Sequence, residues 1–555
     1  MFDAALHTLT HGWHGLALGY GAVAAPMMAG AVRAGAPLGR ILAAPFIAVP
    51  VTLVLGAGFG IVGGVAGFGL NGLSIGLGLL AGSAFGYARG VALAESAADG
   101  FAHQRGTRVV DGAVADNLLR ARDRPGRTDR GPGRDRVEGV AGPAGRASKR
   151  DARGPVTVAG VALSVQDETR HLKIIGATGS GKSTAIRELL RAALARGDRA
   201  VIADPDGSYL RRFFDADRGD VLLNPFDPRS RKWDPFAEIR QPYDVDQLAR
   251  SLIPDHGEAD RSWSAYARTF FSAVMRQAHA GGERDVSELY RLLVAADAAE
   301  LRTLVAGSAA QPFLAEHNTR MFDSIRSVTS SAVAALDYIG RQDGAPLSVR
   351  DWVGRGAAAG AVLFIPYHAG QIAALRTQIS AWMRLAIFEA MDRPEGDQRL
   401  WFVVDELDAL GAIDGLKDAL ARLRKFGGRC ALGFQSVAQV SSTYGAGDAH
   451  TIVENCGNTL ILRASASEGG GTARFASQLI GEREVVRTSV SRTRRALELA
   501  GSRTVSEHRV TEPAVLPAQI EQLPDLAGYL KVASRSEWLR VRLAAPERGA
   551  GCERD

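Results

Sequence analysis

Uncharged, apolar residues dominate the first part of the chain. No Asp, Glu, Lys or Arg occurs in Ile41–Ala88, and the glycine-rich texture of this stretch is typical of closely packed membrane helices. A helix crosses the hydrocarbon core of a bilayer with about 20 apolar residues, so the stretch is long enough for two spans joined by a turn near 63–71. A second uncharged stretch, between Asp3 and Arg33, allows a third span. The pattern predicts a membrane anchor over residues 1–100 with two or three transmembrane helices.

Arginines flank the longer apolar stretch on both sides. Arg33 and Arg40 precede it, and Arg89, Arg105 and Arg108 follow it. Cytoplasmic flanks of membrane helices are enriched in Lys and Arg, so both flanks are expected in the cytoplasm. The sequence thus predicts a multi-pass membrane protein whose remaining chain faces the cytoplasm. A soluble core hairpin is the alternative interpretation of the same stretch.

Three later apolar runs have the length of buried strands. They cover His171–Ile175, Leu400–Val404 and Arg429–Phe434, and each ends in residues typical of a functional loop. A helical pattern follows the first run as far as Ala195. Buried strands that alternate with helices are typical of an α/β fold.

The long spacing from Lys182 to Asp405 indicates an inserted domain, and the pattern within it is helical. Apolar and aromatic side chains recur every three to four residues, and two acidic pairs have the spacing of helix N-caps. The recurring residues are Trp263, Tyr266, Phe270, Val274 and Met275, and the pairs are Asp285 with Glu288 and Asp297 with Glu300. We expect these stripes to form the insert's own core.

Composition changes the picture in residues 101–155. Between Asp123 and Arg153 this segment is rich in Arg, Gly, Asp and Pro and has almost nothing to bury, so a linker is expected. A flexible tail is expected over 541–555. The three cysteines are too few for a disulfide framework or a four-ligand metal site. The net charge of +6 permits contact with nucleic acid without indicating it.

The strongest chemical signal follows the first apolar run. It matches a P-loop placed between a strand and a helix, and it comprises Gly176, Ala177, Thr178, Gly179, Ser180, Gly181, Lys182, Ser183 and Thr184. Its glycines let backbone N–H groups close around phosphates, and the helix N-terminus adds the positive end of its dipole. Lys182 is expected to reach the β- and γ-phosphate oxygens, and Ser183 to hold Mg²⁺. The segment predicts a site for ATP and Mg²⁺.

An acidic pair completes this chemistry. Asp405 and Glu406 follow the buried run LWFVV, where Asp405 would hold the Mg²⁺ shell and Glu406 would polarise the attacking water. Two residues keep two interpretations each. Gln435 is a γ-phosphate sensor or a core glutamine, and Arg424 is an arginine finger for a neighbouring subunit or a surface arginine. The motifs together predict an ATP hydrolase.

The order of these motifs resembles the type IV secretion coupling proteins of bacterial conjugation, the TraD/TrwB branch. The resemblance covers most of the chain after about Arg105, and the segments outside the P-loop discriminate this family from other ATPases. They include RGTRVV (105–110), VAGVAL (158–163), ETRHLKIIGATGSGKS (168–183), GDRAVIADPDGSYL (197–210), LNPFDPRSRKWDPFAEI (223–239), LWFVVDELDAL (400–410), GFQS (433–436) and LPAQIEQLPDLAGYL (516–530).

The resemblance implies a RecA-like nucleotide-binding domain over 156–235 and 345–540, interrupted by an all-α domain over 236–344. It implies a multi-pass anchor in the bacterial inner (plasma) membrane with the ATPase domain in the cytoplasm. It further implies a ring, usually a hexamer, with ATP sites between subunits and a central channel for single-stranded DNA attached to a relaxase. Arg424 and Gln435 match the family's trans-acting arginine finger and sensor glutamine. The implied function is a DNA-dependent ATPase that couples this substrate to a type IV secretion channel and pumps DNA during conjugation.

Other functions share parts of this pattern. A coupling ATPase that recruits protein effectors for export would carry the same nucleotide motifs, as would an FtsK/HerA-like DNA translocase. The FtsK type normally has more membrane spans and a C-terminal winged-helix domain, for which we expect no room after Leu530. An ABC exporter needs an LSGGQ-like signature before its Walker B strand, and none precedes Asp405. The complete set of Lys182, Asp405 and Glu406 disfavours a recruitment platform without ATP turnover.

Overall fold

The structure is a computed structural model of the chain, and it divides into two compact units. One unit comprises residues 1–106 with 483–512, and the other comprises 107–482 with 513–555. The residues whose structure is described are 20–32, 41–49, 81, 83–88, 101–112, 154–255, 261–356, 358–396, 398–466, 471–493 and 502–545.

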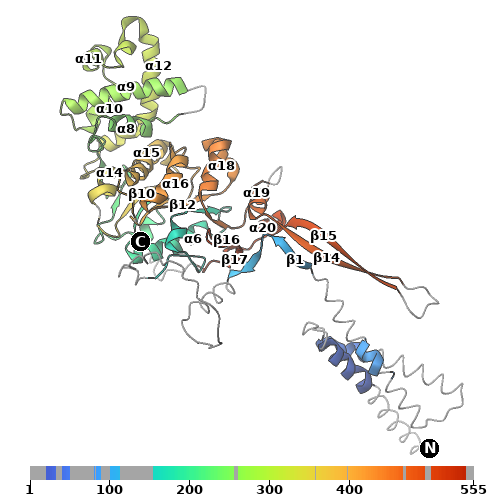
Figure 1. Ribbon diagram of the computed structural model, residues 1–555. Coiled ribbons are helices and arrows are strands. Elements are labelled where there is room, and N and C mark those ends of the chain that lie inside the picture. The colour runs from blue at the N-terminus through green and yellow to red at the C-terminus, as the bar shows by residue number, and fades with distance from the viewer. Residues whose placement is uncertain are drawn as a thin grey trace, which may run out of the picture. The chain divides into compact units, whose positions relative to one another are not determined.

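The second unit is built on a sheet of ten described strands (Figure 1). In spatial order these are β2 (Val109–Asp111), β17 (Trp538–Arg542), β16 (Ala527–Lys531), β13 (Asn458–Ile461), β5 (Leu172–Ile175), β12 (Gly428–Phe434), β11 (Leu400–Val404), β6 (Arg199–Pro205), β10 (Val362–Tyr367) and β7 (Val221–Leu222). The strands from β13 to β7 are parallel, while β16 is antiparallel to β13. Every residue of β5, β10, β11 and β12 is buried, as expected for parallel strands covered on both faces.

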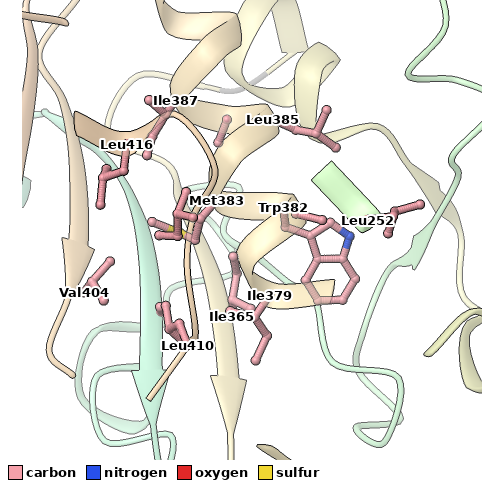
Figure 2. Close-up of a cluster of buried hydrophobic side chains, with 14 of the residues drawn as sticks. Leu252, Ile365, Ile379, Trp382, Met383, Leu385, Ile387, Val404, Leu410 and Leu416 are labelled. Carbon is pink, nitrogen blue, oxygen red and sulfur yellow. The ribbon is translucent and has the colours of Figure 1, made fainter. Parts of the chain in front are cut away.

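Successive residues of a strand point to opposite faces of the sheet, and both sets are buried in the central strands. Helices therefore cover both faces. Ala200 and Ile202 of β6 join the core formed with α6 (Lys182–Arg196), whereas Val201 and Ala203 join the core formed with α15 (Ile372–Met391). The α15 face also carries α16 (Leu416–Leu423), α17 (Val437–Tyr444), α18 (Ala446–Asn455) and α19 (Gly471–Ile480). Figure 2 shows part of this second core, with side chains from β10, β11 and α15.

Short elements complete the second unit. A hairpin formed by β3 (Thr157–Val158) and β4 (Val161–Ala162) packs near α6. The other short elements are α5 (Val165–Glu168), α7 (Leu210–Phe213), α14 (Val349–Asp351), the π-helix η4 (Trp352–Gly356), η5 (Arg424–Phe426) and α20 (Pro517–Glu521).

Between β7 and β10 the chain forms a separate group of helices, which lies beyond α15 in Figure 1. A two-stranded parallel pair joins the entering and leaving segments, β8 (Lys232–Trp233) and β9 (Pro346–Leu347). The helices are α8 (Asp244–Leu252), α9 (Arg261–Ala280), α10 (Val286–Val294), α11 (Ala298–Leu304), η2 (Gln311–Leu314), η3 (Glu316–Asn318), α12 (Thr319–Val333) and α13 (Ala335–Gly340). Helix α8 contacts both α15 and α9. The expected all-α insertion is therefore present.

The residue pattern explains the helices of this insertion. Asp285 and Asp297 are the N-caps of α10 and α11, and their carboxylates accept hydrogen bonds from the N–H groups of Ser287 and Glu300. Phe270, Val274 and Met275 are fully buried in α9, whereas Trp263 and Tyr266 remain about a third exposed. The prediction that this stripe forms the insertion's core is therefore confirmed for Phe270, Val274 and Met275 and is wrong for Trp263 and Tyr266.

The other unit contains a three-stranded antiparallel sheet and short helical segments. The sheet consists of β1 (Phe101–Gly106), β14 (Glu482–Thr493) and β15 (Ser502–Pro513). Arg483 and Arg487 both form ion pairs with Glu512 on the adjacent strand, with N···O distances of 2.8 and 2.6 Å. The hairpin β14–β15 falls inside the range 345–540 expected for the nucleotide-binding domain, but it belongs to this unit.

Two expectations about the flanking segments need correction. Composition predicts a linker over 101–155, but residues 101–106 and 109–111 form strands. A flexible tail is expected over 541–555, but β17 extends into its first residues. Composition fails here because these strands form by pairing with distant segments, β1 with β14 and β2 with β17, which the local composition does not specify. The remaining linker residues 113–153 and tail residues 546–555 lie outside the described residues.

The predicted multi-pass location in the inner membrane is contradicted. Among the residues that the structure describes, no helix combines the length and apolar character needed to cross a membrane. Most of the uncharged stretch Ile41–Ala88 lies outside the described residues. A charge-free sequence indicates apolar character, but it does not by itself establish a spanning helix.

Candidate nucleotide-binding site

The P-loop connects the carboxyl end of β5 to α6, and its glycines are required by geometry. Gly179 and Gly181 have φ of 76° and 118°, in the left-handed region that favours glycine. A Cβ on Gly176 would lie 2.5 Å from Ser180 Oγ, and one on Gly181 would lie 2.9 Å from a methyl group of Leu526. Side chains at these positions would disfavour the conformation of the loop or collide with neighbouring atoms.

Lys182 lies at the centre of this loop. Its ammonium donates hydrogen bonds to the carbonyl oxygens of Gly176 and Ala177, at 2.8 and 3.3 Å. Burial lowers the pKa of Lys182, while the nearby negative charges of Asp405 and Glu406 oppose this effect. Among the residues that the structure describes, the ammonium donates only to these two carbonyl oxygens, which phosphate oxygens can replace.

Asp405 follows β11 and faces the start of α6. Ser183 Oγ donates a hydrogen bond of 2.6 Å to Asp405 Oδ2, and the Tyr209 hydroxyl donates a second bond of 2.8 Å to the same oxygen. The Asp405 side chain is buried, and its other oxygen, Oδ1, has no hydrogen-bond partner among the described residues. A hydroxyl and a carboxylate with a free oxygen are the donors that Mg²⁺ prefers, so these residues fit a magnesium ion.

Glu406 and Gln435 meet on the other side of the P-loop. Gln435 follows β12, which lies between β5 and β11, and its amide donates to Glu406 Oε1 at 3.3 Å. The Thr178 hydroxyl donates to the Gln435 carbonyl oxygen at 3.0 Å. Burial and the adjacent Asp405 charge raise the pKa of Glu406. Gln435 therefore holds Glu406, whose proton affinity is raised, next to the P-loop.

The packing of β11 against β12 brings these groups together. Val404 pairs with Leu432 in the parallel register, so Asp405 lies beside Gly433. A Cβ on Gly433 would lie 2.3 Å from the Asp405 carbonyl oxygen, which leaves room for glycine only. The register thus places the end of the Walker B strand directly against the strand that carries Gln435.

Arg424 is the one predicted site residue that this chain does not bring to the loop. It is exposed, it forms the first residue of η5, and it precedes β12. The P-loop follows the carboxyl end of the parallel strand β5, whereas Arg424 lies near the amino ends of these strands. Within one chain, Arg424 and the P-loop therefore occupy opposite edges of the sheet.

Sequence reasoning missed three polar residues at this edge. Asp204 and Tyr209 lie in and after β6, and Tyr367 ends the neighbouring strand β10. Burial raises the pKa of Asp204 to about 6, and the buried Tyr367 hydroxyl has no hydrogen-bond partner among the described residues. The available signal was the segment ADPDGSYL, whose polar residues directly follow a buried strand.

The carboxyl-terminal segment supports the loop from outside. The Leu526 N–H donates to the Ser180 carbonyl oxygen at 3.0 Å, and the Ala177 N–H donates to the Arg463 carbonyl oxygen at 2.7 Å. Leu526 and Leu543 lie against Gly181. Residues almost 350 positions apart in the chain therefore fix the loop's shape.

A P-loop at the end of a parallel strand, with an acidic pair on a nearby strand and a polar residue on the strand between them, defines a RecA-like P-loop NTPase. The family model described as "Type IV secretion-system coupling protein DNA-binding domain" matches residues 155–544. The chain belongs to this family. The family resemblance and the RecA-like fold with an all-α insertion are thus confirmed.

Two curated relatives are similar to the chain. Coupling protein TraD of Escherichia coli is 30% identical over 392 residues, which are 69% of this chain and 54% of TraD. Type IV secretion system-coupling protein VirD4 of Bartonella henselae is 29% identical over 139 residues, which are 25% of this chain and 21% of VirD4. The match to TraD thus spans about half of that protein's length.

Solved structures of the conjugative coupling protein TrwB are similar over most of the chain. The unbound form of TrwBdeltaN70 is 31% identical, with a TM-score of 0.66 over 80% of this chain and 94% of that chain. TrwB in complex with ADP and Mg²⁺ is 30% identical, also with a TM-score of 0.66, over 80% of this chain and 95% of that chain. A further TrwB structure contains the non-hydrolysable ATP analogue ADPNP.

Proposed function

We propose that the protein is an ATP hydrolase of the coupling protein family, which uses ATP to move single-stranded DNA bound to a relaxase into a type IV secretion channel. The observation that carries the proposal is the convergence of Lys182, Ser183, Asp405, Glu406 and Gln435 at one edge of the sheet. These residues are the set that phosphate binding, metal binding and water activation require.

The geometry gives each residue a role. Backbone N–H groups of Thr178, Gly179, Gly181 and Thr184 would surround the phosphates, whereas those of Gly176, Ala177 and Ser180 donate to backbone carbonyl oxygens and maintain the loop's shape. Lys182 would exchange its carbonyl acceptors for β- and γ-phosphate oxygens. Ser183 and Asp405 would hold Mg²⁺, which neutralises phosphate charge when bound.

Glu406 would orient and deprotonate the attacking water, and its raised pKa favours proton acceptance. Gln435, hydrogen-bonded to Glu406 and to Thr178, would report the presence of the γ-phosphate to β12. In this role Gln435 links the catalytic carboxylate to the loop that surrounds the phosphates.

The identity of the nucleotide and cargo rests on the relatives. TrwB structures contain ADP with Mg²⁺ or an ATP analogue, and the matching family is that of a DNA-binding domain of secretion-system coupling proteins. We extend these properties to this chain because the P-loop and its acidic pair are complete. The proposed partners are single-stranded DNA, a relaxase and components of the secretion channel.

The position of Arg424 favours assembly into a ring. An exposed arginine at the amino ends of the parallel strands cannot serve the nucleotide at the carboxyl ends of the same sheet. In a ring whose ATP sites lie between subunits, one subunit's Arg424 would contact the neighbour's nucleotide as an arginine finger. We therefore propose a homo-hexamer in which 156–235, 345–482 and 513–540 form the ATP-binding domain, without the β14–β15 hairpin, and 236–344 forms a separate all-α domain.

The Glu406→Gln variant tests this proposal. It keeps the shape of the side chain but removes the proton acceptor, so ATP turnover is expected to fall by about 10²- to 10⁴-fold while nucleotide binding persists. Turnover is measured as phosphate release and binding with fluorescent mant-ADP, and the matched control is Glu316→Gln at an exposed position in η3. Turnover in Glu406→Gln equal to that of the control would exclude the assigned site.

A further inference from the structure

Tyr209 is a buried tyrosine whose hydroxyl lies at the centre of the nucleotide site. It is fully buried, and its O–H donates to Asp405 Oδ2 at 2.8 Å. Ser183 donates to the same oxygen at 2.6 Å. Two hydroxyl donors thus fix one oxygen of the carboxylate, and the buried Oδ1 is left with no partner among the residues described.

The ring of Tyr209 is itself held firmly. The Asp204 carboxylate accepts hydrogen bonds from the N–H groups of Tyr209 and Leu210, at 3.0 and 2.7 Å. The guanidinium of Arg187, on α6, lies 5.8 Å from the centre of the Tyr209 ring. The end of β6 thus fixes the backbone of Tyr209, and the full burial of the side chain restricts rotation of the hydroxyl away from Asp405.

These contacts restrict the orientation of the Asp405 carboxylate. A carboxylate with one oxygen fixed by two donors cannot rotate freely, so its second oxygen keeps a constant direction. Hydrogen bonds to groups around a metal orient those groups, and their removal typically weakens metal binding by 10- to 100-fold.

We propose that Tyr209 is a positioning residue for magnesium, because its hydroxyl holds the Asp405 carboxylate so that Oδ1 remains available to the ion or to its water shell. This inference rests on the proposed function and extends it to a residue outside the P-loop and the acidic pair. Asp204 takes part by holding the backbone of Tyr209.

The test compares wild-type protein with Tyr209→Phe, which removes one oxygen atom and keeps the ring. Mn²⁺ affinity is measured by electron paramagnetic resonance in the presence of ADP, with Mg²⁺ as competitor, and mant-ADP affinity is measured separately in EDTA. We expect Mn²⁺ and Mg²⁺ to bind 10- to 100-fold more weakly to Tyr209→Phe, with unchanged mant-ADP affinity in EDTA. Asp204→Asn should weaken metal binding in the same direction by a smaller factor.

The matched control is Tyr290→Phe, which removes a hydroxyl from a partly buried tyrosine of α10 in the all-α insertion. Its metal affinity should equal that of the wild type. Metal affinity in Tyr209→Phe equal to this control would overturn the role of Tyr209. So would an equal loss of mant-ADP affinity in EDTA, because that result indicates general disruption of the site. If wild-type protein bound ADP without any effect of metal, the proposed function itself would fail.

Discussion

His171 links the P-loop strand to helix α16, which precedes Arg424, and its chemistry predicts a loss of stability at low pH. Its Nε2–H donates to the Leu420 carbonyl oxygen at 2.9 Å, and the Cys430 N–H donates to Nδ1 at 3.1 Å. Because a backbone N–H can only donate, Nδ1 must be an unprotonated acceptor and the ring must be neutral. Burial, aided by the positive charge of Arg429, lowers the pKa of His171 to about 4.

The size of the effect follows from linkage. The folded pKa lies below the unfolded value of 6.5, so the native state binds fewer protons than the unfolded state between these values. The stabilisation is therefore complete above the unfolded pKa and is lost as the pH falls toward the folded pKa. The free energy of unfolding should decrease by about 2 kcal/mol from pH 7 to pH 5, and by about 3 kcal/mol at pH 4.

Urea unfolding of the full chain at several pH values measures this loss. His171→Gln is the informative variant, since its amide can donate to Leu420 and accept from Cys430 without titrating. Wild type should lose about 2 kcal/mol more than His171→Gln between pH 7 and pH 5, whereas the exposed control His450→Gln should behave as wild type. Equal pH dependence in wild type and His171→Gln would refute a neutral buried histidine at this position.

Three further variants test other contacts. Gly433→Ala should lower the free energy of unfolding by about 1–3 kcal/mol and reduce ATP turnover, because its Cβ would lie 2.3 Å from the Asp405 carbonyl oxygen. Urea unfolding measures the loss of stability, and the control is Gly447→Ala, whose Cβ would meet open space. Arg424→Ala should leave the unfolding midpoint unchanged but lower turnover by about 10³-fold, and mixing it with Lys182→Ala chains should restore part of the phosphate release. Turnover of Arg424→Ala at the wild-type level would contradict the proposed role of Arg424 as an arginine finger. Asp297→Ala removes the cap of α11 and should cost about 1 kcal/mol in the same unfolding assay, and no change would contradict the capping role.

Local chemistry was predictable from the sequence wherever one segment carries it. The P-loop lies within nine consecutive residues, and the strand before Asp405 is an uninterrupted apolar run, so fold class and the core of the site follow from short patterns. The helix caps Asp285 and Asp297 were predictable for the same reason, since each carboxylate bonds to a backbone N–H only two or three residues away.

The segment that contains Tyr209 signals a functional loop, but the contact of Tyr209 with Asp405 was not predictable because it depends on which strands are neighbours. Tyr209 lies 196 residues from Asp405 in the chain, and the two meet only because β6 and β11 pair in the sheet. Nothing in the local pattern around Tyr209 specifies that pairing. The same reason explains why the β14–β15 hairpin, formed by residues of ordinary composition, was assigned to the nucleotide-binding domain.

ATP turnover of the full chain with and without single-stranded DNA, compared with Lys182→Ala, tests the central claim most directly. The buried Lys182 ammonium donates to two carbonyl oxygens of the P-loop, so its removal should spare the fold and abolish phosphate binding. The account predicts turnover that DNA stimulates, that salt weakens, and that Lys182→Ala lacks. Turnover that is indifferent to DNA, or that persists in Lys182→Ala, would contradict it.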